Sequence, residues 1–330
     1  MKKICCFFFA VLLSTISLSA APRILYVSGE TIMIHAKYEG VLVSGTFDFE
    51  HNDKVIKTHP EDSIQTGDLI IEAGTKIESC TDLNKAIASK SIHTPFIDVT
   101  VLRNGSPQHA KLYLYYDSTK NTFKTGFYIK DHISGSGTLT YYDPTTSSFA
   151  ALGHEIIEKT TGKAATIKTG SIELGQVAEI RPSVMNQPGE KIAHSSGLKI
   201  GTIQVNNEFG LYGTYERPSS YQIMETAAQK DIHLGKAVMM TVVSDHTIEE
   251  IDIMITRINY QKDPDIKGIE FMICDQSILE KTGGIVQGMS GSPIVQNGRI
   301  IGAVTHMIPS APHKGYGMFI EWMIKQSDSL

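Results

Sequence analysis

The chain has 330 residues, a formal net charge of −5 at pH 7 and a pI near 6.2. This length suffices for one large or two medium domains, and the hydrophobic content of 41% is ordinary for a folded protein. The sequence has no strongly basic region and no phosphate-cradling glycine loop, so it argues against nucleic acid as a partner.

Residues 1–21 have the composition of an export signal. Two lysines precede an apolar run at residues 4–13, and small residues follow as far as Ala21. Cleavage after Ala20 or Ala21 fits this pattern. The alternative is an uncleaved membrane anchor, although the apolar run is short for a full span. We therefore expect export across the cytoplasmic membrane, with membrane association through the N-terminus as the alternative.

Cysteine use agrees with export without dependence on disulfides. Two of the four cysteines lie inside the export signal, which leaves Cys80 and Cys274 far apart in the sequence. Two isolated thiols make a poor disulfide framework. No Cys/His cluster has the spacing of a zinc site, so we expect no metal and no cofactor.

Residues 22–117 are predicted to form a small domain of short strands with one helix. Residues 38–43 are typical of a turn that leads into a strand, and Gly67-Asp68 opens a buried strand. A short helix follows as far as Ile87, with Thr81 as the expected cap. Two later strands flank a hairpin turn at Arg103-Asn104-Gly105.

This order of elements resembles a PDZ domain, with Gly67-Asp68 and the hydrophobic residues after it as the most recognisable part. PDZ domains add a peptide strand to the edge of a sheet and bind its carboxylate with backbone N–H groups. The resemblance implies that the binding loop and strand consist of Tyr38, Glu39, Gly40, Val41, Leu42 and Val43. The implied partner is a peptide C-terminus. The alternative is a β-domain whose groove binds nothing.

A polar segment at residues 118–125 is the expected linker, and residues 126–330 form the second predicted domain. In its first part, an apolar run ends at Gly153-His154. A lone histidine in this position is more often structural than catalytic. The middle of the domain, residues 161–258, alternates glycine turns with short strands, which is typical of a β-barrel.

The most informative stretch runs from Gly283 to His306. Within it, Gly288-Met289-Ser290-Gly291-Ser292-Pro293 holds a serine between two glycines, where a tight turn can expose its hydroxyl and leave backbone N–H groups free. Asn297-Gly298 between apolar β-branched residues predicts a β-hairpin. Pro293 argues against a helix after the serine, so the trypsin-like double β-barrel fits better than an α/β-hydrolase elbow.

The stretch 283–306, together with Gly315-Tyr316-Gly317 and Ile320-Glu321-Trp322-Met323, resembles the protease domain of the stage IV sporulation protein B (SpoIVB) peptidase family. Members of this family are serine peptidases of trypsin-like fold that carry a PDZ domain ahead of the protease domain. The resemblance implies a mainly β chain, with a PDZ-like domain followed by a trypsin-like double β-barrel protease domain.

The resemblance also assigns the nucleophile and the base. It implies that Ser290 is the nucleophile, with Ser292 as the alternative in the same motif. The segment Ala151-Leu152-Gly153-His154 resembles the one that carries the family's catalytic histidine, and His306 is the rival general base.

Asp275 resembles the family's catalytic aspartate, which orients the imidazole and stabilises its cation. Asp245 and Asp252 are the fallbacks, and the alternative for Asp275 is a turn or cap aspartate. By analogy with the turns of the trypsin fold, the backbone N–H groups of Gly288 and Ser290 are expected to form the oxyanion hole.

The family implies an exported serine endopeptidase with a Ser/His/Asp acyl-enzyme mechanism. Its implied substrate is a membrane-bound regulator in the space between two membranes of a sporulating cell, whose cleavage leads to processing of a pro-sigma factor. An alternative of a different class is a catalytically inactive peptide-binding scaffold. A third possibility is a broad-specificity quality-control protease of the cell envelope.

Overall fold

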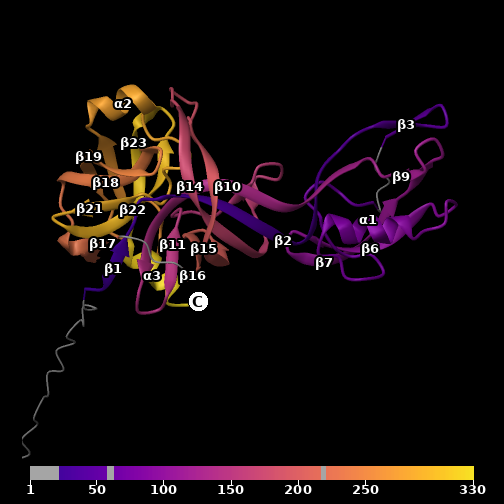
Figure 1. The fold of residues 1–330 in the computed structure, drawn as a ribbon, viewed down its shortest axis with the longest axis horizontal. Coiled ribbons are helices and arrows are strands. Elements are labelled where there is room, and N and C mark those ends of the chain that lie inside the picture. The colour runs from indigo at the N-terminus through magenta and orange to yellow at the C-terminus, as the bar shows by residue number, and fades with distance from the viewer. Residues whose placement is uncertain (1–21, 58–62, 217–220) are drawn as a thin grey trace, which may run out of the picture.

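The computed structural model describes residues 22–57, 63–216 and 221–330. The export signal predicted at residues 1–21 lies outside these ranges. Figure 1 shows a large lobe and a small lobe, and the small one holds α1 (Cys80–Ala88), β6 (Phe96–Arg103) and β7 (Ser106–Tyr113). None of the helices in the described ranges is long and apolar enough to cross a membrane.

Six antiparallel strands close a barrel in the C-terminal half of the large lobe. In ring order they are β18 (Gly235–Ser244), β19 (Thr247–Ile258), β20 (Ile269–Ile273), β23 (Ala311–Phe319), β22 (Arg299–Ile308) and β21 (Pro293–Gln296). Inward-facing side chains such as Met239, Ile253 and Phe271 fill the interior. The predicted hairpin is confirmed, since Asn297 (φ 54°) and Gly298 (φ 72°) connect β21 to β22.

A second ring of six antiparallel strands precedes it in the chain. In ring order they are β2 (Thr31–Thr46), β10 (Phe127–Asp143), β11 (Ser148–Ala151), β16 (Gly210–Tyr215), β15 (Glu190–Asn207) and β14 (Ile167–Arg181), which returns to β2. The prediction of a mainly β chain built on barrels is confirmed. We call this ring the first barrel and the C-terminal ring the second barrel.

The small lobe is inserted between the first two strands of the first barrel. Besides α1, β6 and β7, it contains β3 (Phe49–His51), β4 (Lys54–Ile56), β5 (Leu69–Glu72), β8 (Tyr115–Asp117) and β9 (Thr122–Lys124). Residues 31–37 of β2 pair with β10 and β14, so they belong to the first barrel. The N-terminal domain predicted at residues 22–117 combines these residues with the small lobe. The expected linker, residues 118–125, includes strand β9 of the β8–β9 hairpin.

Helix α1 starts two residues earlier than its predicted cap implies. Ser79 has extended backbone angles, and its hydroxyl accepts a hydrogen bond from the Asp82 N–H at 3.2 Å, which makes it the N-cap. Thr81 lies inside the first turn, so its prediction as the cap is wrong. The helix buries Leu83 against the apolar core of the small lobe.

Shorter elements complete the large lobe. They are β1 (Ile24–Val27), β12 (Ile157–Glu158), β13 (Lys163–Ala164), β17 (Gln222–Glu225), the 3-10 turn Gln229–Asp231, α2 (Gln276–Thr282) and α3 (Ile320–Ser327). Strand β1 pairs with both β10 and β17.

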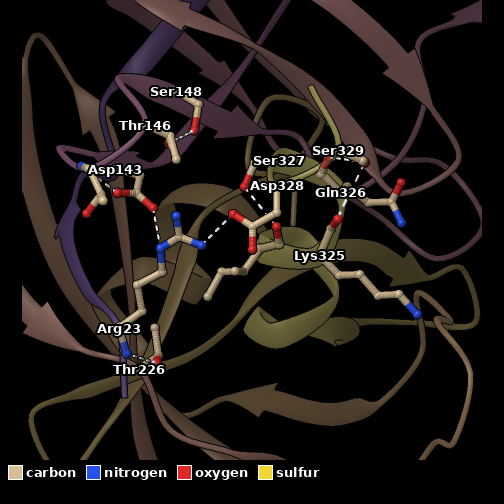
Figure 2. A network of polar contacts seen from close by, with 12 residues as sticks. Arg23, Asp143, Thr146, Ser148, Thr226, Lys325, Gln326, Ser327, Asp328 and Ser329 are labelled. Carbon is tan, nitrogen blue, oxygen red and sulfur yellow. Dashed lines mark hydrogen bonds and ion pairs between the residues drawn. The ribbon is translucent and has the colours of Figure 1, made fainter. Parts of the chain in front are cut away.

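Arg23 joins the start of the described chain to its end (Figure 2). Its Nε atom lies 2.5 Å from Asp143 Oδ2 and its Nη1 atom 2.5 Å from Asp328 Oδ1. Asp143 is the last residue of β10, and its side chain is 1% exposed. Because the loss of one partner would leave a buried charge uncompensated, Arg23 anchors this end of β10.

Candidate active site

Ser290 lies in the turn that leads from α2 into β21. Gly288 (φ 95°) and Gly291 (φ 90°) adopt positive φ values in this turn, a region that favours glycine. Position 291 also has no space for a side chain, since a Cβ there would lie 2.3 Å from the Thr138 carbonyl oxygen and 2.4 Å from the Leu152 nitrogen. The second glycine therefore lets the turn pack directly against the first barrel.

Strand β10 binds the carbonyl groups of this turn. Thr138 donates from Oγ1 to Gly288 O at 2.7 Å and from its backbone nitrogen to Ser290 O at 3.0 Å. Thr140 Oγ1 donates to Gly291 O at 2.7 Å, and both threonines are fully buried. The backbone N–H groups of Gly288 and Ser290 donate no hydrogen bond to any described residue. Two unused N–H groups beside a serine are what an oxyanion hole requires.

The two serines of the motif differ in burial. Ser290 is half-buried, and its Oγ donates to the Thr305 carbonyl at 3.2 Å. Ser292 is fully buried, and its Oγ lies 3.4 Å from Thr138 Oγ1 inside the protein. Of the two candidates, Ser290 is therefore the one with access to a substrate.

His154 follows β11 after a strained turn. The Gly153 N–H donates to the Ala151 carbonyl at 3.0 Å, and Leu152 between them has a φ of 71°, which defines a γ-turn. A non-glycine residue in such a conformation costs about 1–3 kcal/mol and persists only where its surroundings fix it. Leu152 is buried, and its N–H bonds to the Thr138 carbonyl at 3.3 Å. The same residue of β10 thus contacts both loops of the site.

The imidazole of His154 has its proton on Nδ1, because this atom lies 2.7 Å from the Glu155 carbonyl oxygen, which can only accept. Nε2 is therefore the atom with the free lone pair. Burial lowers the pKa of His154 below its usual 6.5, against a smaller opposing effect of the Glu155 carbonyl. The ring is accordingly neutral at pH 7, the form that a general base must have.

His306 packs against His154, with ring centroids 5.2 Å apart and an angle of 41° between the planes. It directly follows Thr305, whose carbonyl accepts the Ser290 hydroxyl. Desolvation of the ring, then repulsion by the protonated form of His154 and by the positive charge of Lys267, lower the pKa of His306 to about 4. The structure therefore gathers Ser290 and both candidate bases where the two barrels meet.

Asp275 is not joined to this group. Its Oδ1 atom accepts hydrogen bonds from the Ser277 hydroxyl at 2.7 Å and the Ile278 N–H at 3.2 Å, which makes it the N-cap of α2. These bonds, the Ser277 one first, lower the pKa of the carboxyl. Within the described residues, neither Asp275 nor the fallbacks Asp245 and Asp252 bonds to His154. The Glu155 carbonyl, rather than a carboxylate, contacts Nδ1 of His154, and an aspartate directly before a helix is well placed to cap it.

The predicted peptide-binding residues, Tyr38 to Val43, lie inside β2, and four of the six are already paired with a neighbouring strand. On one side, Val41 and Leu42 pair with β5; on the other, Leu42 and Val43 pair with β10. Glu39 is the one exposed residue of the six, and the Tyr38 hydroxyl donates to Glu158 inside the protein. These residues therefore do not form the open carboxylate-binding loop and strand that the sequence analysis expected.

Lys191 is a residue near the site that the sequence analysis did not single out. It is 4% exposed, its Nζ donates to Thr241 Oγ1 at 2.7 Å, and its stem lies under Gly288, where a Cβ would be 3.2 Å away. Burial lowers the pKa of Lys191 to about 7. Thr138 and Thr140 were also missed, although their spacing of two on a strand was the available sign that they share a face.

Comparisons with known proteins give a family and a set of distant solved structures. A family model described as SpoIVB peptidase S55 matches residues 121–324. One similar crystal structure is that of the Rv3671c protease in an inactive form, with 13% identity, a TM-score of 0.33, and coverage of 59% of this chain and 83% of that chain. A serine-to-alanine mutant of Rv3671c from M. tuberculosis H37Rv, also inactive, gives 12% identity, a TM-score of 0.33, and coverage of 59% and 80%. No curated protein matches the chain.

Proposed function

The chain belongs to the SpoIVB peptidase S55 family, and on this premise we propose that it is a serine endopeptidase with Ser290 as nucleophile and His154 as general base. Membership in the family makes the chain a serine peptidase. The geometry of the Ser290 turn is the observation that supports these roles most. Strand β10 binds the carbonyls of this turn, and the N–H groups of Gly288 and Ser290 stay unused among the described residues. The His154 loop packs against the same turn.

In the acylation step, Ser290 Oγ attacks the carbonyl carbon of the scissile peptide while its proton passes to Nε2 of His154. The carbonyl π electrons move onto oxygen, and the N–H groups of Gly288 and Ser290 donate hydrogen bonds to that oxyanion. The Ser290 hydroxyl must first leave the Thr305 carbonyl and turn toward His154. Such catalytic hydrogen bonds commonly tighten only when substrate is bound.

In the remaining steps, the imidazolium returns its proton to the leaving amine, the C–N bond breaks, and an ester forms on Ser290. Water then attacks this ester as Nε2 of His154 takes its proton. The second oxyanion collapses, the C–O bond to Ser290 breaks, and the imidazolium returns its proton to Oγ, which releases the acid product and restores the hydroxyl. Throughout, the Glu155 carbonyl holds the Nδ1–H and fixes the ring. A neutral carbonyl orients the ring as a carboxylate does, but it stabilises the imidazolium less.

For the biological setting, we propose a membrane-bound regulatory protein of a sporulating cell as the substrate, cleaved in the space between two membranes. Family membership supports this setting, and so does the export signal predicted at residues 1–21. Cleavage of the regulator would allow an intramembrane protease to activate a late transcription factor.

A fluorophosphonate probe that reacts with activated serines tests the proposed nucleophile. We expect the wild-type protein to be labelled, Ser290→Ala to lose all labelling, and Ser292→Ala to retain it because Ser292 is buried. Turnover of a peptide substrate should fall on the order of 10⁶-fold in Ser290→Ala. Persistent labelling in Ser290→Ala would refute the assignment, and a folded wild-type protein that is never labelled would favour the inactive scaffold.

Unfolded casein separates a regulatory peptidase from a quality-control protease. A regulatory enzyme should cleave casein slowly and at few sites, whereas rapid cleavage at many sites would favour broad specificity. The Ser290→Ala protein, purified in the same way, controls for contaminating proteases.

A further inference from the structure

The peptide group between Glu155 and Ile156 is hydrogen-bonded at both of its ends. Its carbonyl oxygen lies 2.7 Å from Nδ1 of His154, and its N–H donates to Asn206 Oδ1 at 2.8 Å. A trans peptide is planar, and its C=O and N–H point in opposite directions. The imidazole and the Asn206 side chain therefore lie at opposite ends of one rigid unit, so that the direction of the carbonyl depends on the contact with Asn206.

The strands of the first barrel place Asn206 at this position. Asn206 lies near the end of β15 and pairs with Leu211 of β16, and Leu211 pairs on its other side with Ala151, the last residue of β11. Two strand spacings, about 10 Å in total, thus separate Asn206 from Ala151. The chain from Ala151 through His154 to Ile156 spans this distance and reaches the Asn206 side chain.

The half-buried amide of Asn206 is held in one orientation. Its Nδ2 atom donates to the Ala165 carbonyl at 3.1 Å and more weakly to the Ile156 carbonyl at 3.5 Å. Exchange of Oδ1 and Nδ2 would set donor against donor and acceptor against acceptor, because an N–H only donates and a carbonyl only accepts. The Ala165 N–H also donates to the Ile156 carbonyl at 2.8 Å. Asn206 therefore closes the base of the β12–β13 hairpin that follows His154.

The two hydrogen bonds of this peptide group strengthen each other. Donation from the Ile156 N–H to Asn206 moves electron density onto the Glu155 oxygen, which makes that oxygen a better acceptor for the imidazole. Hydrogen bonds in such a chain gain about 10–30% each. The gain is largest when His154 is protonated, because a charged donor makes the stronger bond. The contact with Asn206 thus supplies part of the stabilisation that a neutral carbonyl alone lacks.

We infer that Asn206 is a positioning residue of the peptidase, which holds the peptide group between Glu155 and Ile156 so that its carbonyl binds Nδ1–H of His154 and Nε2 stays available to Ser290. This inference rests on the proposed function, in which His154 is the general base. Among the described residues, the hydrogen bonds of the Asn206 side chain reach the base loop and its hairpin and not the imidazole itself. Asn206 therefore acts through the peptide group.

Steady-state kinetics of two neighbouring asparagine variants tests this inference. Asn206→Ala frees the peptide group to turn, so kcat should fall about 10²-fold, the usual cost of a misplaced catalytic group, with KM changed less than about threefold. Asn207→Ala is the matched control. Its side chain, at the next position of β15, bonds to Gln326 and to the Phe209 N–H and makes no printed bond to the base loop. This variant should keep kcat within about threefold of the wild-type value.

The pH dependence of kcat/KM separates positioning from a merely structural role. The bond from the Glu155 carbonyl raises the pKa of His154, so Asn206→Ala, which loosens this bond, should move the midpoint of the acidic limb to lower pH. Asn206→Asp keeps an acceptor for the Ile156 N–H and adds a negative charge, so it should move the midpoint to higher pH. The other titratable groups that face the ring, His306 and the Glu155 carboxylate, are unchanged in both variants. A structural role would lower activity and leave both midpoints in place.

Nitrogen NMR of histidine-labelled protein gives a readout that needs no turnover. In the Ser290→Ala chain, neutral His154 should carry its proton on Nδ1; adding Asn206→Ala should produce a mixture of both tautomers, and adding Asn207→Ala should not.

Two results would overturn the inference: a pure Nδ1–H tautomer in the chain with Asn206→Ala, or equal kcat values and midpoints for Asn206→Ala and Asn207→Ala. If Asn206→Ala does not fold, Asn206→Asp decides, and a midpoint that does not rise overturns the inference. A wild-type chain without peptidase activity, whose His154 tautomer still depends on Asn206, would refute the proposed function and support the orientation of the ring by Asn206.

Discussion

The two loops that meet at the candidate active site are held in different ways. The Ser290 turn is fixed by hydrogen bonds from Thr138 and Thr140 to its carbonyls. The His154 loop has one backbone bond to β10, the buried Leu152 in a strained turn, the packing of its imidazole on His306, and a hydrogen bond from the Ile156 N–H to Asn206 Oδ1 at 2.8 Å. Strand β10 therefore fixes the nucleophile turn through three hydrogen bonds, whereas it binds the base loop through one.

The largest expected effect tests which imidazole is the base. His154→Ala should lower kcat on the order of 10⁶-fold, as the loss of the base does in a serine protease, whereas His306→Ala should cost less than about tenfold. Steady-state kinetics on one peptide substrate measures both. If His306→Ala were the more damaging change, the assignment of the two histidines would be reversed.

The pH dependence of the wild-type enzyme sharpens this test. A base must be neutral, so kcat/KM should rise as the pH increases through the pKa of His154, and burial places this pKa below 6.5. We therefore expect the acidic limb to have its midpoint below pH 6.5 in the wild-type protein. A midpoint above 6.5 would show that a negative charge, rather than burial, dominates the surroundings of the base.

A second prediction concerns the hydrogen bonds by which β10 holds the Ser290 turn. Thr138→Val keeps the shape of the side chain but removes the bond to the Gly288 carbonyl, so the turn should lose part of its preorganisation. We expect kcat to fall about 10²-fold, near the lower end of the effect of losing an oxyanion-hole donor, with KM nearly unchanged. Thr140→Val, which frees Gly291 O instead, is the matched control and should lower kcat less for a similar loss of stability.

The sequence predicted the parts of this site that depend on local chemistry. The glycines around Ser290 and the Asn297-Gly298 hairpin have short-range signatures, so their conformations follow from neighbouring residues. The contacts from Thr138 to the turn join residues 150 positions apart, which no local pattern reports. Family resemblance suggested both His154 and Asp275 as catalytic residues. The structure places His154 beside Ser290, whereas Asp275 caps a helix.

In the small lobe, too, the sequence predicted local features and not long-range strand pairing. Its helix, its hairpin at Asn104-Gly105 and its buried strand after Gly67 were predicted from turn and cap residues. The sequence did not reveal that β2 continues from the first barrel into this lobe, nor that β10 returns beside it. Both facts depend on strand pairing across more than 80 residues, for which a single sequence holds no register information.

A third prediction concerns the packing beneath the nucleophile turn. Among the described residues, the buried Lys191 has no acidic partner, and its pKa of about 7 lies below the usual 10.4. The unfolded chain therefore binds more protons than the folded one between these values, so this group makes stability rise with pH from about 7 to about 10.4. Lys191→Met should stabilise the protein by about 2 kcal/mol at pH 7 and by much less near pH 10.4.

Chemical denaturation of both proteins across this pH range measures the difference. The informative quantity is the gap between the two unfolding free energies, because the other titrating groups are common to both chains. Parallel pH profiles would mean that Lys191 stays charged in the folded protein. Lys236→Met, at a position on β18 that is exposed, provides the control for the loss of one positive charge.

The smallest expected effect decides between the two roles of Asp275. As the N-cap of α2, it should contribute about 1 kcal/mol to stability, and Asp275→Ala should lower the free energy of unfolding by that amount. Activity should change less than about threefold, because the Glu155 carbonyl, rather than this carboxylate, holds His154. A catalytic aspartate would instead show a loss near 10⁴-fold on conversion to asparagine, with little change in stability. Since asparagine also caps helices well, Asp275→Asn separates the roles most cleanly: retained stability and retained kcat together identify a cap, and retained stability with a large loss of kcat identifies the third member of a triad.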